Sequence, residues 1–372
     1  MAWDKLLISA DSHVVEPADL FAKALGDKYG DKVPRFVDEY QGVKGRYYFT
    51  GKEHLRLSVL IEGDEAEQDK LTKAGRDPAF RLECLDEDGI YAEVLYASST
   101  LHTMRAFDDQ LVQDCCQVFS DWLADHRSEN PKRLFGCAPI HMADVNWAVA
   151  ELERVAKLGM TTVTINCDTR DGWEPYRSAH YDPFWARAEE IGLPVSLHIL
   201  TGNERASFTL HGDERSQGVR RSLGVFHEAF APLANEFIFG GIFDRFPKLN
   251  IMLAEFEVSW LVYWMFRVEQ FERSFGPSVG VPMPKRRVRE YMSQVYHGVV
   301  DELYLDKVLD LIDPKTLVWG SDFPHARCTY PNSRKIVHDL YGHHSEAFVD
   351  DLTFNNAALL FGIEVPSTGS RP

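Results

Sequence analysis

The sequence lacks any apolar run long enough to cross a membrane and any segment typical of a secretion signal. A membrane-spanning helix needs about 18 or more consecutive apolar residues, and no stretch of the 372-residue chain approaches that length. The amino-terminal residues MAWDKLLISADSH contain no basic stretch followed by a long apolar one, which a signal peptide requires. We therefore expect an unprocessed cytoplasmic protein with no membrane partner.

Basic residues are in the minority. The chain has 40 lysines and arginines against 57 acidic residues, so its formal net charge is −17. Such a charge repels nucleic acid and anionic membranes, and we expect neither as a partner. An anionic small-molecule substrate remains open, because a metal ion and a few arginines reverse the sign of the charge locally.

Two common motifs are also missing. None of the six cysteines forms a CxxC pair, and most lie in apolar contexts, which predicts buried free thiols in a reducing cytoplasm. No glycine-rich phosphate loop follows the first predicted strand, which runs instead into DSHVVEP. A doubly wound open sheet that binds a dinucleotide is therefore the less favoured layout.

What the chain does contain is a regular alternation of short β-rich runs with segments of helical periodicity. Strands that alternate with helices imply right-handed crossovers and a parallel sheet, and eight such units close into a (β/α)8 barrel. The eight predicted strands are Leu6–Ser9, Ala92–Ala97, Leu134–Ile140, Thr161–Ile165, Pro194–Leu200, Asn250–Ala254, Gln294–Val299 and Thr316–Trp319.

The segments between the strands predict helices and three insertions within one domain, residues 1–364. The insertions cover residues 17–78, where a small hairpin is expected, and residues 201–218 and 274–289, which are candidate lids or binding loops. Residues 365–372 are expected to form a disordered tail. Helices are predicted over Asp144–Leu158, Tyr181–Ile191, Val219–Asn235, Val258–Phe275 and Glu302–Ile312, with Asp144 and Asp182 as amino-terminal caps.

Polar residues stand where several of the predicted strands end. Asp11 and His13 follow the first run, His198 lies in the fifth, Glu255 follows the sixth and Asp322 follows the eighth. A parallel barrel places its chemistry at the carboxyl ends of its strands, so these side chains are expected to meet there. Two histidines and up to three carboxylates in one place indicate a divalent metal ion.

These residues lie within stretches that resemble a known family. SADSHVVEP, LDEDGIYAEVLY, PVSLHI, GGIFDRFPKLNIMLAE and VWGSDFPH are similar to the amidohydrolase-related family, in the branch typified by aminocarboxymuconate-semialdehyde decarboxylase. The resemblance spans nearly the whole chain and implies a distorted barrel with one divalent metal, zinc first and manganese second. It implies Asp11, His13, His198 and Asp322 as metal ligands and His325 as a neighbour that supports them. Asp322 would also accept a proton from the water on the metal.

The sixth strand departs from the family pattern. Decarboxylases of this family commonly have a histidine where this chain has Glu255, so Glu255 is open as a metal ligand, a general base or a structural partner. The resemblance also suggests Arg267 as a substrate contact at a homodimer interface. Arg205 and His297 are further candidates for binding the substrate.

Together these observations predict a metal-dependent enzyme that acts on a small cyclic or aromatic carboxylate-type substrate. Because Glu255 replaces the usual histidine, hydrolysis by an activated water is slightly favoured, with Asp322 or Glu255 taking the proton. Non-oxidative decarboxylation of an aromatic or unsaturated carboxylate is the alternative. A barrel that has lost catalysis and only binds a ligand is the third possibility.

Overall fold

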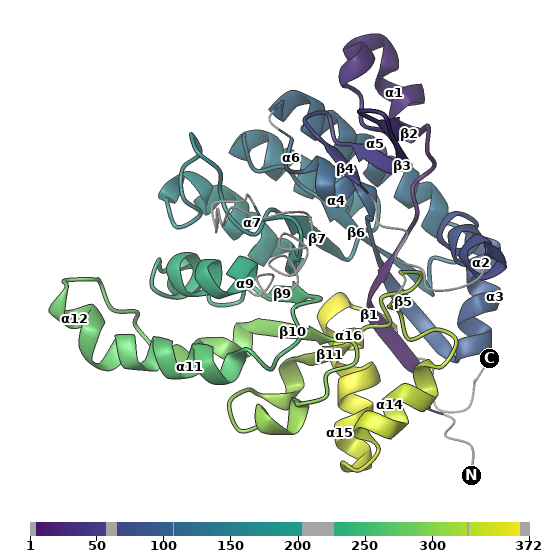
Figure 1. Cartoon of the computed structure of the whole chain (residues 1–372). Coiled ribbons are helices and arrows are strands. Elements are labelled where there is room, and N and C mark those ends of the chain that lie inside the picture. Colours follow the sequence, from purple (N-terminus) through teal and green to yellow (C-terminus); the bar gives the residue numbers. More distant parts are fainter. Residues whose placement is uncertain (1–4, 57–64, 107, 203–226, 326, 365–372) are drawn as a thin grey trace.

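The computed structural model describes residues 5–56, 65–106, 108–202, 227–325 and 327–364. Its centre is a sheet of eight parallel strands in the order of the sequence, and helices surround it (Figure 1). The predicted (β/α)8 barrel is therefore confirmed, and each predicted strand overlaps an observed one. The strands are β1 Leu7–His13, β5 Ile90–Tyr96, β6 Leu134–Pro139, β7 Thr162–Ile165, β8 Val195–His198, β9 Ile251–Ala254, β10 Val295–Val299 and β11 Leu317–Trp319.

The barrel closes at the seam between β11 and β1. Two backbone hydrogen bonds join the segments there, from Asp322 N to Asp11 O (3.0 Å) and from His13 N to Phe323 O (2.7 Å). Gly320 makes the close approach possible, because a Cβ at this position would lie 2.9 Å from the Cβ of Asp11. The seam thus brings the ends of the first and last strands together at the residues that carry the predicted chemistry.

The strands bury both of their faces, which explains why they read as apolar runs. Side chains at alternate positions of β1, β5, β6, β9 and β11 form one cluster in which strands from opposite sides of the barrel meet, so this cluster fills the interior. The intervening residues, such as Leu253 and Leu317, belong to the larger cluster between the strands and the helices.

Four of the five predicted helices overlap observed ones, although residues 219–226 of one of them lie outside the described residues, and two corrections are needed. Asp144 caps its helix through bonds from the backbone N–H groups of residues 146 and 147, but Asp182 lies inside its helix and Tyr181 is the N-cap. The segment Glu302–Ile312 is not an α-helix; only Leu305–Lys307 forms a 3-10 turn. The longer described helices are α1 Leu20–Tyr29, α2 Glu65–Arg76, α3 Pro78–Asp88, α5 Asp109–Arg127, α6 Val145–Lys157, α7 Asp182–Ile191, α11 Leu261–Gln270 and α14 Ser333–Tyr341.

The short helices are α4 Ser99–Thr103, α9 His227–Pro232, α10 Ile242–Arg245, α12 Gly276–Ser278, α13 Val288–Tyr291, α15 Glu346–Asp350 and α16 Asn356–Phe361. π-Helical turns at Leu233–Ile238, Phe271–Phe275 and Asp351–Asn355 extend three of the helices.

Two of the three insertions can be seen. The first holds the expected hairpin, β2 Arg35–Tyr40 and β3 Val43–Phe49, extended by β4 His54–Arg56. Its two-residue turn is formed by Gln41 and Gly42, with φ of 53° and 78°, as a right-twisted hairpin favours. The insertion at 274–289 carries α12 and leads into α13. Most of the 201–218 insertion and the tail lie outside the described residues.

None of the helices in the described parts of the chain combines the length and the apolar character that a bilayer crossing demands.

Candidate metal centre

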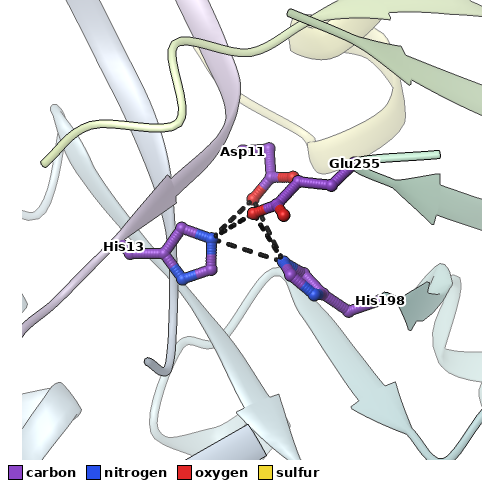
Figure 2. A group of neighbouring side chains, drawn as sticks. All are labelled: Asp11, His13, His198 and Glu255. Carbon is purple, nitrogen blue, oxygen red and sulfur yellow. Dashed lines mark hydrogen bonds and ion pairs between the residues drawn. The ribbon is translucent and has the colours of Figure 1, made fainter. Parts of the chain in front are cut away.

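Side chains from β1, from β8 and from the segment after β9 converge at the carboxyl end of the barrel. Asp11 and His13 lie two residues apart on β1 and so point to the same side, and His198 is the last residue of β8. Glu255 directly follows β9. All four turn toward one another in Figure 2, and Asp11, His13 and His198 are buried to 1% exposure or less.

The atoms at the centre of this group are close. Glu255 Oε1 lies 2.8 Å from His13 Nε2 and 3.1 Å from His198 Nε2, and the two Nε2 atoms are 3.3 Å apart. Asp11 Oδ1 lies 3.6 Å from His13 Nε2 and 3.9 Å from His198 Nε2. One ligand-type atom from each residue therefore lies within 4.8 Å of all the others.

Both imidazole rings are oriented by a backbone carbonyl on their far side. His13 Nδ1 lies 2.8 Å from the carbonyl of Ala97, and His198 Nδ1 lies 2.8 Å from the carbonyl of Ile199. A ring nitrogen that faces a carbonyl must carry the hydrogen and donate it. In a neutral ring this leaves Nε2 with its lone pair turned to the centre, as a metal-binding histidine requires.

Carboxylate oxygens in the cluster lack hydrogen-bond partners, and a bound cation would interact with them favourably. Both carboxylate oxygens of Asp11 are buried and have no hydrogen-bond partner. Buried carboxylates without partners are costly, and buried charges are normally paired or bound to metals. The donor set of imidazole nitrogens and carboxylate oxygens, arranged around one point, is suited to a divalent ion.

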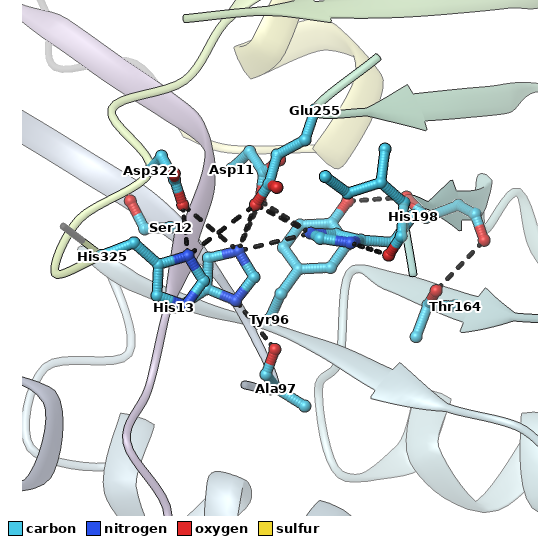
Figure 3. A network of polar contacts seen from close by, with 12 residues as sticks. Asp11, Ser12, His13, Tyr96, Ala97, Thr164, His198, Glu255, Asp322 and His325 are labelled. Atoms are coloured by element: carbon cyan, nitrogen blue, oxygen red, sulfur yellow. Dashed lines mark hydrogen bonds and ion pairs between the residues drawn. The ribbon is translucent and has the colours of Figure 1, made fainter. Parts of the chain in front are cut away.

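Asp322 and His325 form the second part of the site, across the barrel seam from β1 (Figure 3). Asp322 Oδ1 lies 2.7 Å from His325 Nδ1 and 3.5 Å from His13 Nε2. The His325 ring stacks on His13 at 3.9 Å between centroids, and its Nε2 meets Ser98 Oγ at 3.1 Å. The side chain of His325 is 36% exposed, so this pair connects the buried centre with solvent.

The pKa values show how strongly the carboxylates and imidazoles interact when no ion is bound. Burial lowers the pKa of His13 to about 3. Burial also acts to lower the pKa of His198, but the charges of Glu255 and Asp11 outweigh it and raise this pKa to about 10. Burial raises the pKa of Asp11, and burial together with the charge of Glu255 raises the pKa of Asp322 to about 6.

Two of the site residues have unusual backbones. Glu255 has φ of 62° and Asp322 has φ of 56°, in the left-handed region that side chains other than glycine seldom occupy. Such conformations cost about 1–3 kcal/mol each and gather at functional sites. Glu255 and Asp322 each place their carboxylate just beyond the end of a strand, where it lies close to His13.

The structure brings together six of the residues singled out from the sequence and separates the others. Arg267 is exposed on α11 and bonds only Gln270 among the contacts described. His297 is buried on β10 between Leu253 and Leu317, both on the helix-facing side, so it points away from the barrel interior. Arg205 lies outside the described residues. The six that meet are Asp11, His13, His198, Glu255, Asp322 and His325.

Sequence reasoning missed Tyr96. Its buried ring lies 5.4 Å from the His198 ring and 6.1 Å from the His13 ring, and its hydroxyl meets Ser196 Oγ at 2.6 Å (Figure 3). The available signal was its place as the last residue of β5, at the same end of the barrel as the other site residues.

Comparison with known proteins identifies relatives of this chain. The chain is 26% identical over 259 residues to the gamma-resorcylate decarboxylase of Polaromonas sp. strain JS666, covering 66% of this chain and 76% of that protein. It is 25% identical over 257 residues to the 2-amino-3-carboxymuconate-6-semialdehyde decarboxylase of Dictyostelium discoideum, covering 67% of each.

The fold is shared with a dihydroxybenzoic acid decarboxylase of Polaromonas sp. JS666, whose crystal structure holds manganese and the inhibitor 2-nitroresorcinol. The TM-score is 0.67 at 18% identity, over 96% of this chain and 97% of that one.

These relatives overturn the preference for hydrolysis. That preference rested on Glu255 standing where decarboxylases commonly have a histidine, yet the relatives that match over two thirds of the chain are decarboxylases. The decarboxylase relatives therefore outweigh the inference that was drawn from Glu255 alone. The sequence matches the amidohydrolase family over residues 42–363. This range includes β5 and every later strand of the barrel. The chain belongs to this family of enzymes.

Proposed function

We propose that the protein is a metal-dependent, non-oxidative decarboxylase of a small aromatic or unsaturated carboxylate. The observation that carries the proposal is that relatives spanning two thirds of the chain are decarboxylases of such compounds. The buried cluster of carboxylates and imidazoles supports it, because side chains of these types suit the binding of a cation and the transfer of a proton, and they lie at the end of the barrel where such folds carry out catalysis.

The residues that would hold the ion are Asp11, His13, His198 and Glu255. They fit because both imidazole Nε2 atoms and one oxygen of each carboxylate face one point, and both oxygens of Asp11 are otherwise unsatisfied. Asp322 is a further ligand candidate from across the seam, through its Oδ1. Mixed nitrogen and oxygen ligands suit both zinc and manganese, so elemental analysis has to decide between them.

A bound divalent ion would supply the positive charge that holds a substrate carboxylate and a neighbouring oxygen. We assign the proton transfer to Asp322. In the absence of an ion, burial and the charge of Glu255 raise the pKa of Asp322 to about 6. The assignment rests on position, because Asp322 Oδ1 lies 2.7 Å from Nδ1 of the partly exposed His325, through which a proton can reach it from solvent.

The proposed reaction balances with one proton. The Asp322 carboxyl group gives its proton to the substrate carbon that bears the carboxylate, and a pair of the substrate's π electrons forms the C–H bond there. The C–C bond to the carboxylate then breaks, its electron pair restores the π bond, and CO2 leaves. His325, 2.7 Å from Asp322 and partly exposed, returns a proton from solvent to Asp322.

We also propose that the protein is a homodimer that associates through α11. One face of this helix presents Val262, Tyr263 and Phe266 at 46%, 61% and 55% exposure. An apolar patch of this kind on a surface helix marks an interaction site. Arg267 lies on the same exposed side, where a partner subunit would meet it.

The function is tested by assaying CO2 release with protein that has been stripped of metal and then reloaded with Mn²⁺ or Zn²⁺. The substrates are ortho-hydroxybenzoates, a carboxymuconate-type acid and matched esters and lactones. We expect metal-dependent CO2 release from at least one free acid and no turnover of the esters. Metal-dependent cleavage of an ester or a lactone without any CO2 would reject the proposal.

A further inference from the structure

The most completely buried ion pair near the site takes no part in the chemistry described above. Arg81 on α3 and Glu93 on β5 are both 0% exposed. Arg81 Nε pairs with Glu93 Oε1, and Nη2 donates to Glu93 Oε2 at 2.8 Å, so the contact is bidentate. Two charges are thus removed from water in the layer directly behind the first strand of the barrel.

The remaining donors of Arg81 reach both sides of the barrel seam. Nη1 donates to the backbone carbonyl of His13 at 2.7 Å, and Nη2 donates to the carbonyl of Phe323 at 3.1 Å. The guanidinium carbon also lies 5.0 Å from the centroid of the Phe323 ring. A single rigid group therefore contacts the backbone of one metal-ligand candidate and that of the residue directly after Asp322.

This seam is the place where the barrel needs such a connection. β1 and β11 are the two ends of the sheet order, and the backbone bonds of Asp11 and His13 to the segment after β11 join them. The adjoining Asp322 has φ of 56°, a conformation that the surrounding structure has to impose. The gap between β1 and this segment sets the 3.5 Å distance from His13 Nε2 to Asp322 Oδ1.

A buried ion pair is weak evidence for stability as such. The desolvation of both charges offsets much of their attraction, and an apolar replacement of both partners is often neutral or stabilising. Arginine differs from lysine in presenting several donors in a fixed plane, so only arginine bonds a carboxylate and two carbonyls at once. The geometry therefore suits a role in placing the backbone more than a role in holding the fold.

We propose that Arg81, held by Glu93, is a positioning residue that sets the spacing between His13 and Asp322 and thereby tunes the affinity of the site for its metal ion. The inference rests on the proposed function, because it takes the cluster to be a metal site. Outer partners that orient metal ligands typically change affinity by about 10- to 100-fold when they are removed.

Three variants test the proposal. Arg81→Lys keeps the positive charge for Glu93 but cannot bridge the two carbonyls. The double variant Arg81→Met with Glu93→Leu removes both charges together and leaves an apolar filling. Arg133→Lys is the matched control, because Arg133 donates to the carbonyls of Tyr91 and Ile90 at 2.8 and 2.9 Å at the opposite end of β5.

The readouts are the Mn²⁺ affinity by titration calorimetry and the melting temperature with and without Mn²⁺. We expect Arg81→Lys and the double variant to bind Mn²⁺ about 10- to 100-fold more weakly and to lose part of the metal-induced rise in melting temperature. The metal-free double variant should stay folded, and Arg133→Lys should bind Mn²⁺ as the wild type does.

Each other outcome has a definite meaning. Wild-type affinity in a folded Arg81→Lys protein would overturn the proposal. So would loss of the fold in both Arg81 variants while Arg133→Lys remains folded, because the pair would then serve the barrel and not the site. A wild-type protein that binds no divalent ion would reject the proposed function itself, which keeps the two failures apart.

Discussion

The substitution Asp322→Asn separates proton transfer from the fold and from metal binding. Asparagine has the same shape and can accept a hydrogen bond, but it cannot carry the transferable proton that the proposed reaction takes from Asp322. Loss of a positioned general acid typically lowers the rate by about 10²- to 10⁴-fold. At about 1.4 kcal/mol for each factor of ten, this raises the activation barrier by about 3–5 kcal/mol.

The fold should tolerate this change well. Asparagine is among the few residues enriched at positive φ, so it fits the value of 56° at this position. The four residues proposed as the main ligands remain in place. We therefore expect near-complete loss of CO2 release, a melting temperature close to that of the wild type, and metal that is retained at high metal concentration.

The assay measures CO2 release and metal content on the same samples. Asp88→Asn is the matched control, because Asp88 is another buried aspartate, with a pKa raised by burial, but it bonds Ser333 away from the centre. We expect this control to keep its turnover within a few-fold of the wild type. An Asp322→Asn protein that carries full metal and retains substantial activity would refute the assignment of proton transfer to Asp322.

Four further predictions follow from the same geometry. Glu255→Gln removes the charge nearest to both imidazoles, so the affinity for Mn²⁺ should fall and the turnover should drop by about 10²-fold or more, while circular dichroism remains unchanged. The pKa of His198 is about 10 in the metal-free protein, so its proton is present at pH 7 and is lost only as the pH rises through that value. Calorimetry in buffers of different ionisation enthalpy should therefore detect the release of this proton when the metal binds. For the same reason, the affinity for the metal should rise with pH. Gly320→Ala would bring a Cβ to 2.9 Å from that of Asp11, so the melting curve should show destabilisation by about 1–3 kcal/mol. Phe266→Glu should convert a dimer into a monomer in light scattering, whereas the same change at the exposed Leu359 on α16 should not.

Much of the barrel could be predicted because its strands are buried on both faces. Such strands read as short apolar runs, and the polar residues that end them stand out against that background, as His198 does in PVSLHIL. The spacing of Asp11 and His13 by two residues likewise placed both on one side of a strand. The strand ends therefore pointed to five of the six clustered residues, and the family resemblance added the sixth, His325.

Other features depend on contacts that no local pattern contains. His297 resembles a pocket residue in the sequence, but the register of β10 places Tyr296 with the interior cluster and turns His297 outward. The apolar residues of Glu302–Ile312 suggested a helix, yet Leu303 and Tyr304 are 72% and 62% exposed and lack a core to pack against. Arg81 gave no signal, because its partners lie 12 and 242 residues away along the chain.

The proposal that this metal centre catalyses decarboxylation is tested most directly by tracing where the carboxylate and the incoming proton end up. The metal-loaded protein is supplied with a hydroxybenzoate or muconate-type acid in D2O, and CO2 and product are measured together. We expect one CO2 per product molecule and one deuterium at the carbon that lost its carboxylate. A product that keeps its carboxylate and has gained the elements of water, with no CO2 released, would contradict it.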